Sequence, residues 1–463
     1  MKTVFINLSL RPGAKHRHLP VGLAYVMTAA KRAGFEFDYI DIDLDELADE
    51  DLRVLLQQGG YDVVAFGCIV TGYKYIKKTA ELIKEISPRT TIIAGNSVAT
   101  SIPHILLTHT LVDIAVLGEG DVTIVELLHR IERGEGYHDV QGIAFKVEDK
   151  VVFSAPRPVE PDLDRFGFPD WNIFNLEKYS AYLRINHNVT SGKSVIGYPL
   201  NSGRGCPHAC TFCYHVFRGK KYRRYSEAAI IEEVRRLHQT FGASFISFWD
   251  ELTFPNTQAV RELLHGLKGL DFIVNWDAPC RAGLLKRGDV DLVREMKALG
   301  CDNIAFSLEN ASPEILAAMN KKISVEQFIE QAETLARGGV TPLTSVIFGY
   351  PQETPETIQM TIDVCERCNI FPSVGFLLPL PGTPIYEWAK THGHIPDEVK
   401  YLESIGDRQD FHINLTTMSD ETLKGTVEEG LIKLAAKQGL NLDSVFKTTT
   451  YQAPKAKQPE PES

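Results

Sequence analysis

The sequence predicts an α/β protein in which a doubly wound, Rossmann-like domain over residues 1–134 is followed by a partial barrel over residues 194–384. In both ranges, short runs rich in Val and Ile alternate with amphipathic stretches, which is typical of βα units whose strands are buried on both faces. A proline-rich connector, residues 135–193, separates the two series. A small helical region is expected over 385–447, and the tail 448–463, which lacks an apolar pattern, is expected to be disordered.

The length and charge of the chain limit its functional class. Its 463 residues are enough for about three domains. The net charge of −11 argues against a broad nucleic-acid-binding surface and favours a small-molecule substrate. No apolar run approaches the length of a membrane-spanning helix, and the N-terminus lacks the apolar core and cleavage site of a secretory signal. We therefore expect a cytoplasmic protein without a membrane span.

The first domain is predicted to be a parallel sheet with helices on both faces. Its strands are expected at Thr3–Leu8, Phe37–Ile42, Asp62–Cys68, Thr91–Gly95 and Asp113–Leu117. Its helices are expected at Val21–Ala33, Asp45–Gln57, Tyr73–Ile86, Val98–His109 and Val122–Arg133. Such sheets bind ligands beyond the carboxyl ends of their strands, so the loops at these ends hold the candidate binding residues.

Three of these loops are rich in small or polar residues. The third strand ends at Cys68–Gly72, the fourth at Gly95–Ser97 and the fifth at Gly118–Gly120. Glycine there lets the backbone approach a flat or phosphorylated ligand, although each loop taken alone is better explained as a tight βα turn. No G-x-G-x-x-G sequence follows the first strand, which disfavours a dinucleotide site.

The connector begins with a predicted hairpin, Gln141–Arg157, whose turn lies at Glu148–Lys150. Several prolines follow, so the chain is expected to be extended and to leave the first domain. The aromatic residues Trp171, Phe174 and Tyr179 indicate that the connector packs against one of the domains.

Three closely spaced cysteines, Cys206, Cys210 and Cys213, follow the first strand of the second domain in a C-x3-C-x2-C pattern. Thiolates this close together bind an iron–sulfur cluster or another soft metal. The alternatives are a structural role in a core, or a zinc site with His208 or His215 as fourth ligand. The zinc site lacks the second C-x2-C pair that is usual for zinc. A four-iron cluster on three thiolates leaves one iron open to a substrate or cosubstrate.

The remaining cysteines of the second domain, Cys280, Cys301, Cys365 and Cys368, are expected to be buried thiols. Cys365 and Cys368 share one predicted helix face, but a second cluster there would need two further ligands that the sequence does not offer.

Six βα units are predicted in the second domain, and they form a partial barrel with its chemistry at the carboxyl ends of the strands. The strands are expected at Ser194–Asn201, Phe245–Trp249, Trp276–Cys280, Ile304–Leu308, Ser345–Phe348 and Phe376–Leu378. The helices between them are expected at Glu227–Thr240, Asn256–Gly266, Asp289–Leu299, Val325–Arg337 and Pro355–Arg367, with a C-terminal helix at Glu421–Gln438.

Polar or proline-rich motifs follow four of these strands, namely Asp250-Glu251, Glu309-Asn310, the G-Y-P-Q-E-T sequence Gly349–Thr354 and the P-L-P-G-T-P sequence Pro379–Pro384. With the cysteine pattern and Tyr214 beside its third cysteine, they make residues 194–390 resemble the radical S-adenosylmethionine (SAM) superfamily. The resemblance implies a [4Fe–4S] cluster on the three cysteines. Its open iron would chelate SAM, which is cleaved reductively to methionine and a 5′-deoxyadenosyl radical.

The resemblance also assigns SAM contacts to Tyr214, Asp250, Glu251, Ser307 and Glu309. From the residues alone, Asp250-Glu251 and Glu309 are explained equally well as N-caps of the helices that follow them. Arg281, after the third strand, is expected to pair with a carboxylate on a barrel strand.

The first domain contains the sequences LPVGLAYV and VLGEG, and with its place ahead of the barrel it resembles the cobalamin-binding domain of cobalamin-dependent radical SAM enzymes. The resemblance places cobalamin contacts at Thr71, Gly72, Tyr73, Asn96, Ser97, Gly118, Glu119 and Gly120. The D-x-H-x-x-G motif, which supplies an axial histidine in other cobalamin proteins, is absent. The lower axial position of cobalt is then empty or filled by water or another side chain. Thr71 and Tyr73 are candidates near that face, and packing explains Tyr73 at least as well.

The resemblance implies a methyltransferase that moves a methyl group from methylcobalamin to an unactivated carbon of a small molecule, using SAM, cobalamin and the cluster. A cyclase or rearrangement enzyme shares every motif and is the first alternative. A non-catalytic corrinoid-binding sensor and a zinc-binding structural protein are alternatives of other classes, and the intact cysteine triplet disfavours the sensor. An external electron donor such as flavodoxin or ferredoxin is expected, and the chain is expected to act as a monomer.

Overall fold

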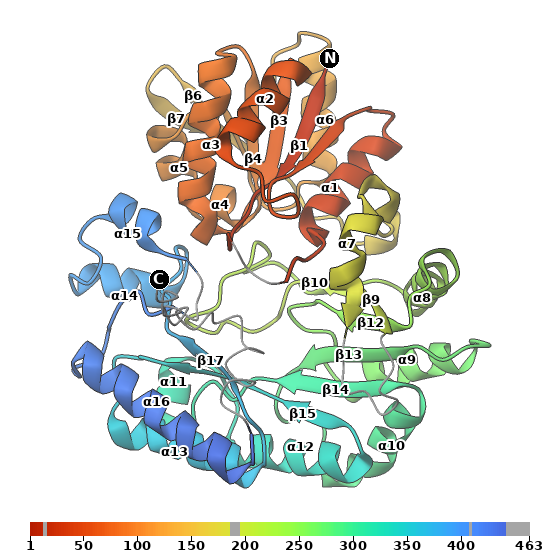
Figure 1. The fold of residues 1–463 in the computed structure, drawn as a ribbon, viewed down its shortest axis with the longest axis vertical. Helices are drawn as coiled ribbons and strands as arrows, with labels where there is room; N and C mark the ends of the chain where they lie inside the picture. The colour runs from red at the N-terminus through yellow and green to blue at the C-terminus, as the bar shows by residue number, and fades with distance from the viewer. Residues whose placement is uncertain (13–15, 186–194, 407–409, 441–463) are drawn as a thin grey trace, which may run out of the picture.

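The computed structural model describes residues 1–12, 16–185, 195–406 and 410–440, so the tail predicted to be disordered lies outside the described residues. Two α/β bodies lie one above the other, with the N-terminal domain at the top of Figure 1 and the barrel below it. The predicted fold class is confirmed. No helix in the described ranges is both long enough and apolar enough to cross a membrane.

A seven-stranded sheet forms the N-terminal domain, in the order β2-β1-β3-β4-β5-β6-β7. Its strands are β1 (Thr3–Asn7), β2 (Asp38–Asp41), β3 (Val63–Gly67), β4 (Thr91–Gly95), β5 (Ile114–Val116), β6 (Ile143–Val147) and β7 (Lys150–Phe153). Strands β1 to β5 pair in parallel, and the β6–β7 hairpin pairs antiparallel with β5. The hairpin predicted inside the connector therefore extends the sheet of the first domain.

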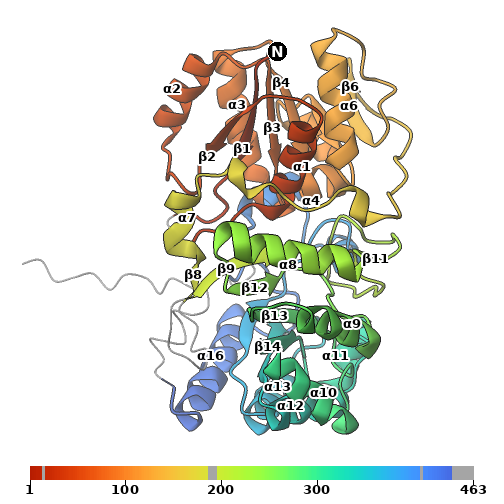
Figure 2. The ribbon, with the colours of Figure 1, turned by 90° about the vertical axis from the view of Figure 1, so that its right-hand side faces the viewer.

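Helices cover both faces of this sheet, with α2 and α3 on one side and α1 and α6 on the other (Figure 2). They are α1 (Val21–Arg32), α2 (Asp49–Gly59), α3 (Tyr73–Ile86), α4 (Asn96–Ser101), α5 (Pro103–His109) and α6 (Asp121–Glu132). The single helix predicted at Val98–His109 is wrong. The helical backbone breaks at Ile102 (φ −133°) because the following Pro103 starts a new helix and disfavours helical geometry in the residue before it.

The second domain is a partial barrel. A six-stranded sheet runs in the order β15-β14-β13-β12-β9-β8, and the pair β16–β17 continues it through a bridge between Glu309 and Val346. Its strands are β8 (Arg184–Ile185), β9 (Val195–Leu200), β12 (Phe245–Phe248), β13 (Asn275–Cys280), β14 (Cys301–Phe306), β15 (Thr341–Leu343), β16 (Ser345–Phe348) and β17 (Ser373–Phe376). A short antiparallel pair, β10 (Gly203–Arg204) and β11 (Arg223–Arg224), brackets the cysteine loop.

Helices pack outside the barrel, and the last three helices of the described chain follow its final strand. They are α8 (Glu227–Phe241), α9 (Thr257–Lys268), α10 (Val290–Ala298), α11 (Pro313–Ala318), α12 (Val325–Gly338), α13 (Pro355–Arg367), α14 (Pro384–Thr391), α15 (Glu398–Ser404) and α16 (Asp420–Lys437). Sequence-encoded caps set several boundaries: Ser226, Ser324 and Thr354 each accept a hydrogen bond from the first turn of the helix that follows.

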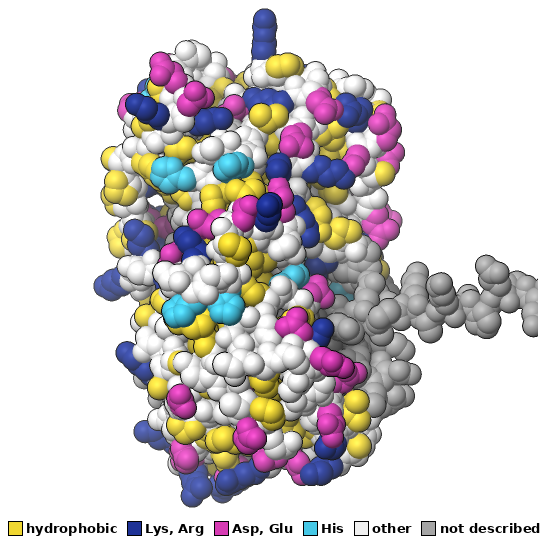
Figure 3. Space-filling model, turned by 90° about the vertical axis from the view of Figure 1, so that its left-hand side faces the viewer, with side chains coloured by type: hydrophobic (Ala, Val, Ile, Leu, Met, Phe, Trp, Pro, Cys, Tyr) yellow, Lys and Arg dark blue, Asp and Glu magenta, His cyan; other side chains and the backbone are white. Residues whose placement is uncertain are grey.

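The connector packs between the two domains, as its aromatic residues predicted. Trp171 and Tyr179 are each 1 % exposed, and Tyr179, on α7 (Leu176–Leu183), donates a hydrogen bond to Asp41 of the N-terminal sheet. On another side, α15 contacts α3 through an ion pair between Glu403 and Lys77 (2.7 Å). The face shown in Figure 3 mixes basic and acidic side chains.

Candidate functional site

Two adjoining cavities lie where the carboxyl ends of the N-terminal strands face the cysteine loop. The first, of about 410 Å³, is lined by the ends of β3, β4 and β5, by α1 and α6, and by residues 214–217 of the cysteine loop. The second, of about 580 Å³, lies between the loop after β1, the cysteine loop and the ends of β16 and β17. Ile69, Asn96 and Tyr214 line both cavities, so the two spaces share a wall.

Most residues predicted to contact cobalamin line these cavities. Asn96, Ser97, Gly118, Glu119 and Gly120 line the first cavity, and Thr71 lines the second. Gly72 and Tyr73 line neither, and Tyr73 is fully buried among apolar side chains of the N-terminal core. Packing therefore accounts for Tyr73, as the alternative explanation held.

The first cavity has features that suit a large, flat ligand. A Cβ added at Gly95 or at Gly118 would meet no atom within 4 Å, so both glycines face open space. Ile69 and Trp249 are large apolar side chains left 46 % and 42 % exposed, and both line this cavity. Apolar area of this kind is costly to leave in water and marks a surface that a ligand covers. These residues would suit the large, flat corrin ring of cobalamin.

The cysteine loop is held by hydrogen bonds within itself and by hydrogen bonds to the C-terminal end of α11. Arg218 donates to the carbonyl oxygens of Cys210 (3.0 Å) and Cys213 (2.6 Å). Thr211 donates to the carbonyl oxygen of Ala318 (2.9 Å), and Asn320 donates to that of Ala209 (2.9 Å). The loop conformation is thus fixed by its own backbone contacts, with the three thiol groups left to bind a ligand.

The thiols of Cys206, Cys210 and Cys213 lie near enough to interact electrostatically with one another. Across the ranges that the structure describes, no three His, Cys, Asp or Glu side chains converge closely enough to hold one metal ion. The three thiols therefore lie together on one loop as candidate ligands for the cluster that the resemblance implies.

Several basic side chains lie near this loop, together with the carboxylates of Glu251 and Glu309. Burial, together with the charges of Arg281, Lys321 and Lys322, lowers the pKa of His208 to about 4. Burial also raises the pKa of Cys213 to about 11, so this thiol is neutral without a ligand. A cationic setting stabilises thiolates, cluster sulfides and the carboxylate of a chelating amino acid alike.

Arg281 lies beside the cysteines and not beside a carboxylate as predicted. Its Nη1 is 3.9 Å from the sulfur of Cys210, and its Nη2 is buried without a hydrogen-bond partner in the described part of the chain. A buried guanidinium donor without a partner is costly and calls for an anionic acceptor. A cluster sulfide or the SAM carboxylate fits this position.

Asp250 anchors the segment that leads into the cysteine loop. It accepts hydrogen bonds from the Ser202 hydroxyl (2.7 Å), the Gly203 amide (3.0 Å) and the Thr253 hydroxyl (2.8 Å). The next helix is capped by Asn256, so the helix-cap explanation of Asp250 is wrong. The neighbouring Glu251 accepts a hydrogen bond from the Gly205 amide (3.3 Å) and lines the first cavity.

Glu309 forms a buried ion pair with Lys321 (2.7 Å), and their side chains are 7 % and 9 % exposed. Its backbone is left-handed (φ 64°), which is uncommon for a residue other than glycine. Helix α11 is capped by Ser312, so the cap explanation of Glu309 is wrong too. Ser307, also predicted to contact SAM, shares a hydrogen bond with Ser345 (2.7 Å), the first residue of β16.

The electrostatics of Asp250 give a testable pH dependence. Burial raises its pKa to about 6, even though its hydrogen bonds act in the opposite direction. The folded state therefore holds this proton more tightly than the unfolded state does. The stabilising contribution of the protonated carboxyl is present near pH 4 and is lost as the pH rises through about 6.

We expect the stability difference between the wild type and Asp250→Asn to shift in favour of the wild type as the pH falls from 7 to 5. The measurement is thermal unfolding of the cluster-free chain across this range. Asp291→Asn, at a side chain that is 92 % exposed, is the matched control and should give a difference that does not vary with pH. A difference for Asp250→Asn that is equally constant would contradict the raised pKa.

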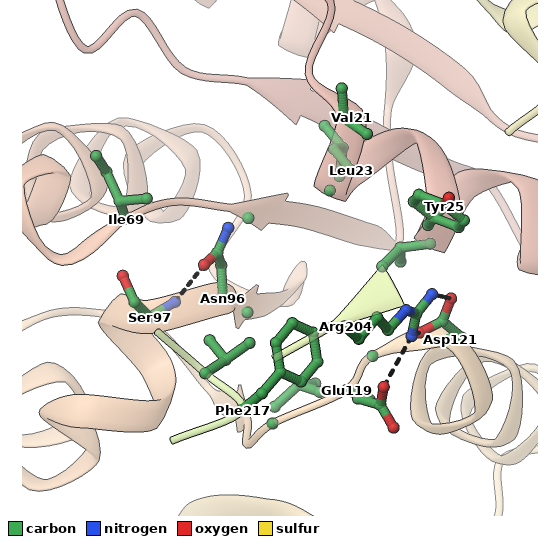
Figure 4. Close-up of a pocket in the computed structure, with 18 of the residues that line it drawn as sticks. Val21, Leu23, Tyr25, Ile69, Asn96, Ser97, Glu119, Asp121, Arg204 and Phe217 are labelled. Atoms are coloured by element: carbon green, nitrogen blue, oxygen red, sulfur yellow. Dashed lines mark hydrogen bonds and ion pairs between the residues drawn. The ribbon is translucent and has the colours of Figure 1, made fainter. Parts of the chain in front are cut away.

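Several residues of this site have no signal in the sequence pattern. Arg204 and Asp121 line the first cavity and bind each other from different domains (Figure 4). Lys321 and Phe217 likewise sit in loops whose sequence carries no motif. For Arg204, the local signal is its position two residues before Cys206, which places it near the cysteine loop.

Comparisons with known proteins agree with this geometry. The family model of the B12 binding domain matches residues 13–128, and that of the radical SAM superfamily matches residues 200–365. The uncharacterized methyltransferase PH0819 of Pyrococcus horikoshii is 27 % identical over 80 % of this chain and 78 % of its own length. An anaerobic magnesium-protoporphyrin IX monomethyl ester cyclase of Cereibacter sphaeroides is 26 % identical over 87 % of this chain and 66 % of its own length.

Solved structures show the same fold. The radical SAM methyltransferase TsrM of Kitasatospora setae superimposes with a TM-score of 0.67 at 18 % identity, over 85 % of this chain and 77 % of that one. The cobalamin-dependent radical SAM enzyme OxsB superimposes with a TM-score of 0.66 at 15 % identity, over 95 % of this chain and 62 % of that one.

Proposed function

We propose that this chain, which carries a B12-binding domain followed by a radical SAM domain, is a methyltransferase that places a methyl group on an unactivated carbon of a small molecule. One observation carries the proposal: Tyr214, adjacent to the proposed cluster ligand Cys213, lines both cavities. The cavity that we assign to the corrin and the cysteine loop thus border one shared space. When bound, the cluster and SAM supply the substrate radical, and cobalamin supplies the methyl group.

The protein's own part is to hold these groups and to exclude water. We assign the cluster to Cys206, Cys210 and Cys213, with Arg281 facing its anionic side. The polar groups of Asp250 and Glu251 fix the backbone on which the first cysteine sits, and Glu309 with Lys321 borders the third. Such rigid placement supplies catalysis by orientation.

The barrel-side wall of the second cavity consists of apolar side chains, namely Phe212, Ile347, Phe376, Leu377, Leu378 and Leu380. A dry wall of this kind protects a carbon radical from water and from proton donors. It supports a reaction that begins with hydrogen-atom abstraction.

We further propose that flavodoxin or ferredoxin supplies the electron and that the chain works as a monomer. Lys220 and Lys221 are exposed near the end of the cysteine loop, just before β11. Acidic electron carriers are attracted to such a basic turn.

Methyl-labelled SAM tests the proposed reaction without a known substrate. The chain with cluster and cobalamin is incubated anaerobically with reductant and labelled SAM. We expect the label in the corrin fraction and S-adenosylhomocysteine in matching amount, because a methyltransferase must recharge cobalt from SAM.

A cyclase or rearrangement enzyme has no need of this transfer and should leave the corrin unlabelled. The cyclase names among the relatives make that outcome the main competitor. An unlabelled corrin together with formation of 5′-deoxyadenosine would replace the methyltransferase proposal by the cyclase one. Absence of both products would favour the corrinoid-binding sensor.

A further inference from the structure

Four buried charged residues join the two domains beside the first cavity; we call them the interdomain ion cluster. Arg204 donates to Asp121 from both terminal guanidinium nitrogens, Nη1 and Nη2 (2.8 and 3.0 Å), and to Glu119 from Nη1 (2.9 Å). Arg223 binds both oxygens of Glu119 (3.0 and 2.8 Å). Figure 4 shows Arg204 reaching across to Glu119 and Asp121 at the rim of the cavity.

The interdomain ion cluster is buried and carries no net charge. The side chains of Arg204, Arg223, Glu119 and Asp121 are 9, 4, 10 and 6 % exposed, and their two positive and two negative charges cancel. The guanidinium of Arg204 also lies over the ring of Tyr25, at 5.0 Å. Charges buried this deeply are costly to separate, so the four side chains of the interdomain ion cluster should move together as one unit.

One end of this unit is the wall of the cobalamin cavity. Glu119 and Asp121 line the cavity, and Glu119 belongs to the loop that runs from Gly118 to Gly120. The position of the loop therefore depends on where the two arginines hold its carboxylate.

The other end is the cysteine loop. Arg204 ends strand β10 and is separated from Cys206 only by Gly205, which has a left-handed backbone (φ 90°). Strand β10 pairs directly with β11, which carries Arg223, so both arginines share one small ribbon. A ligand that fixes Cys206 also fixes this ribbon.

We propose that the interdomain ion cluster couples the two cofactor sites, so that loading of the iron–sulfur cluster strengthens cobalamin binding, with Arg204 as the positioning residue. Binding of the iron–sulfur cluster to the cysteines orders the β10–β11 ribbon, and the arginines of the ribbon order Glu119 and Asp121. The cavity wall is then preorganised for the corrin. A preorganised wall binds its ligand more tightly because less ordering remains to be done. The inference rests on the two cofactor domains and not on methyl transfer.

The test measures the affinity for hydroxocobalamin by corrin absorbance, with the full chain either loaded with its cluster or stripped of iron by a chelator. In the wild type we expect the loaded form to bind at least about fivefold more tightly. In Arg204→Lys, which keeps the charge but loses the forked geometry, the two forms should bind equally. Arg224→Lys is the matched control, because Arg224 lies on the same ribbon but pairs with Glu262 inside the barrel domain (3.3 Å) and should keep the wild-type ratio.

Equal affinities in the two wild-type forms would overturn the proposal. So would a wild-type ratio that persists in Arg204→Lys, since the coupling would then run through residues 214–217, which line the cavity directly. Circular dichroism checks that each variant is folded. If Arg204→Lys does not fold, Asp121→Asn, which keeps the shape of the pair, replaces it. We then expect the loaded and the iron-free forms of Asp121→Asn to bind hydroxocobalamin equally. A chain that shows the coupling but leaves the corrin unlabelled in the SAM experiment would refute the methyltransferase alone.

Discussion

Replacing Cys213 with serine is expected to abolish reductive cleavage of SAM. It should also lower the iron content below the value of about four irons per chain that one [4Fe–4S] cluster requires. The thiol is a proposed cluster ligand, and a hydroxyl is a poor substitute for a thiolate on iron. The fold should survive, because Arg218 holds the loop through the carbonyl oxygens of Cys210 and Cys213 and not through their sulfurs. Iron and sulfide content and 5′-deoxyadenosine formation are the measurements.

Cys368→Ser is the matched control for this experiment. Cys368 is likewise partly buried, but it caps the C-terminal end of α13, away from the cysteine loop. It should retain full iron content and SAM cleavage. Two results together would return the site to the zinc alternative. The wild type would hold one tightly bound zinc, and the variant with all three loop cysteines replaced by alanine would keep its colour and activity.

The second large effect concerns the buried pair of Glu309 and Lys321. Replacing Lys321 with methionine leaves the Glu309 carboxylate buried without its partner, which should lower the free energy of unfolding of the barrel by about 3–5 kcal/mol. Replacing Glu309 with glutamine in the same chain removes the stranded charge and should restore most of this loss. Urea unfolding of the single and double variants measures both values.

A surface pair provides the comparison. Lys433 pairs with Glu429 along α16, and their side chains are 64 % and 68 % exposed. Lys433→Met should change the free energy of unfolding by no more than about 0.5 kcal/mol. If Lys321→Met were equally mild, the ion pair between Glu309 and Lys321 would not stabilise the barrel. The double variant separates this stabilising role from any loss of SAM affinity, which should persist after stability has returned.

Local chemistry made much of the fold predictable. The bounds of α13 and β16 agree with the sequence prediction, because Thr354 and Pro355 form a cap and first turn that fix where the helix begins. The cysteine spacing and the motifs after four strands likewise pointed to the region in which the two cavities lie. Each of these signals lies within a few neighbouring residues.

Contacts between distant segments were beyond the sequence. Arg204 and Asp121 are 83 positions apart, and the local sequence around each residue does not predict contact with the other. Arg281 was expected beside a carboxylate but lies by Cys210, because burial and barrel closure decide its neighbours. The helix break at Pro103 was missed because a helical hydrophobic pattern continues across it, so periodicity concealed the turn.

The ion pair between Lys77 and Glu403 has a consequence for biosynthesis. These residues are 326 positions apart, so the contact forms only when nearly the whole chain has left the ribosome. The N-terminal sheet emerges and folds first, since domains generally fold as units during synthesis. Its cavity then lacks the walls that residues 214–217 and the ends of β16 and β17 later supply. The nascent chain thus passes through a stage in which the first cavity is open to solvent, and this stage ends when the cysteine loop and the barrel strands dock against the N-terminal sheet.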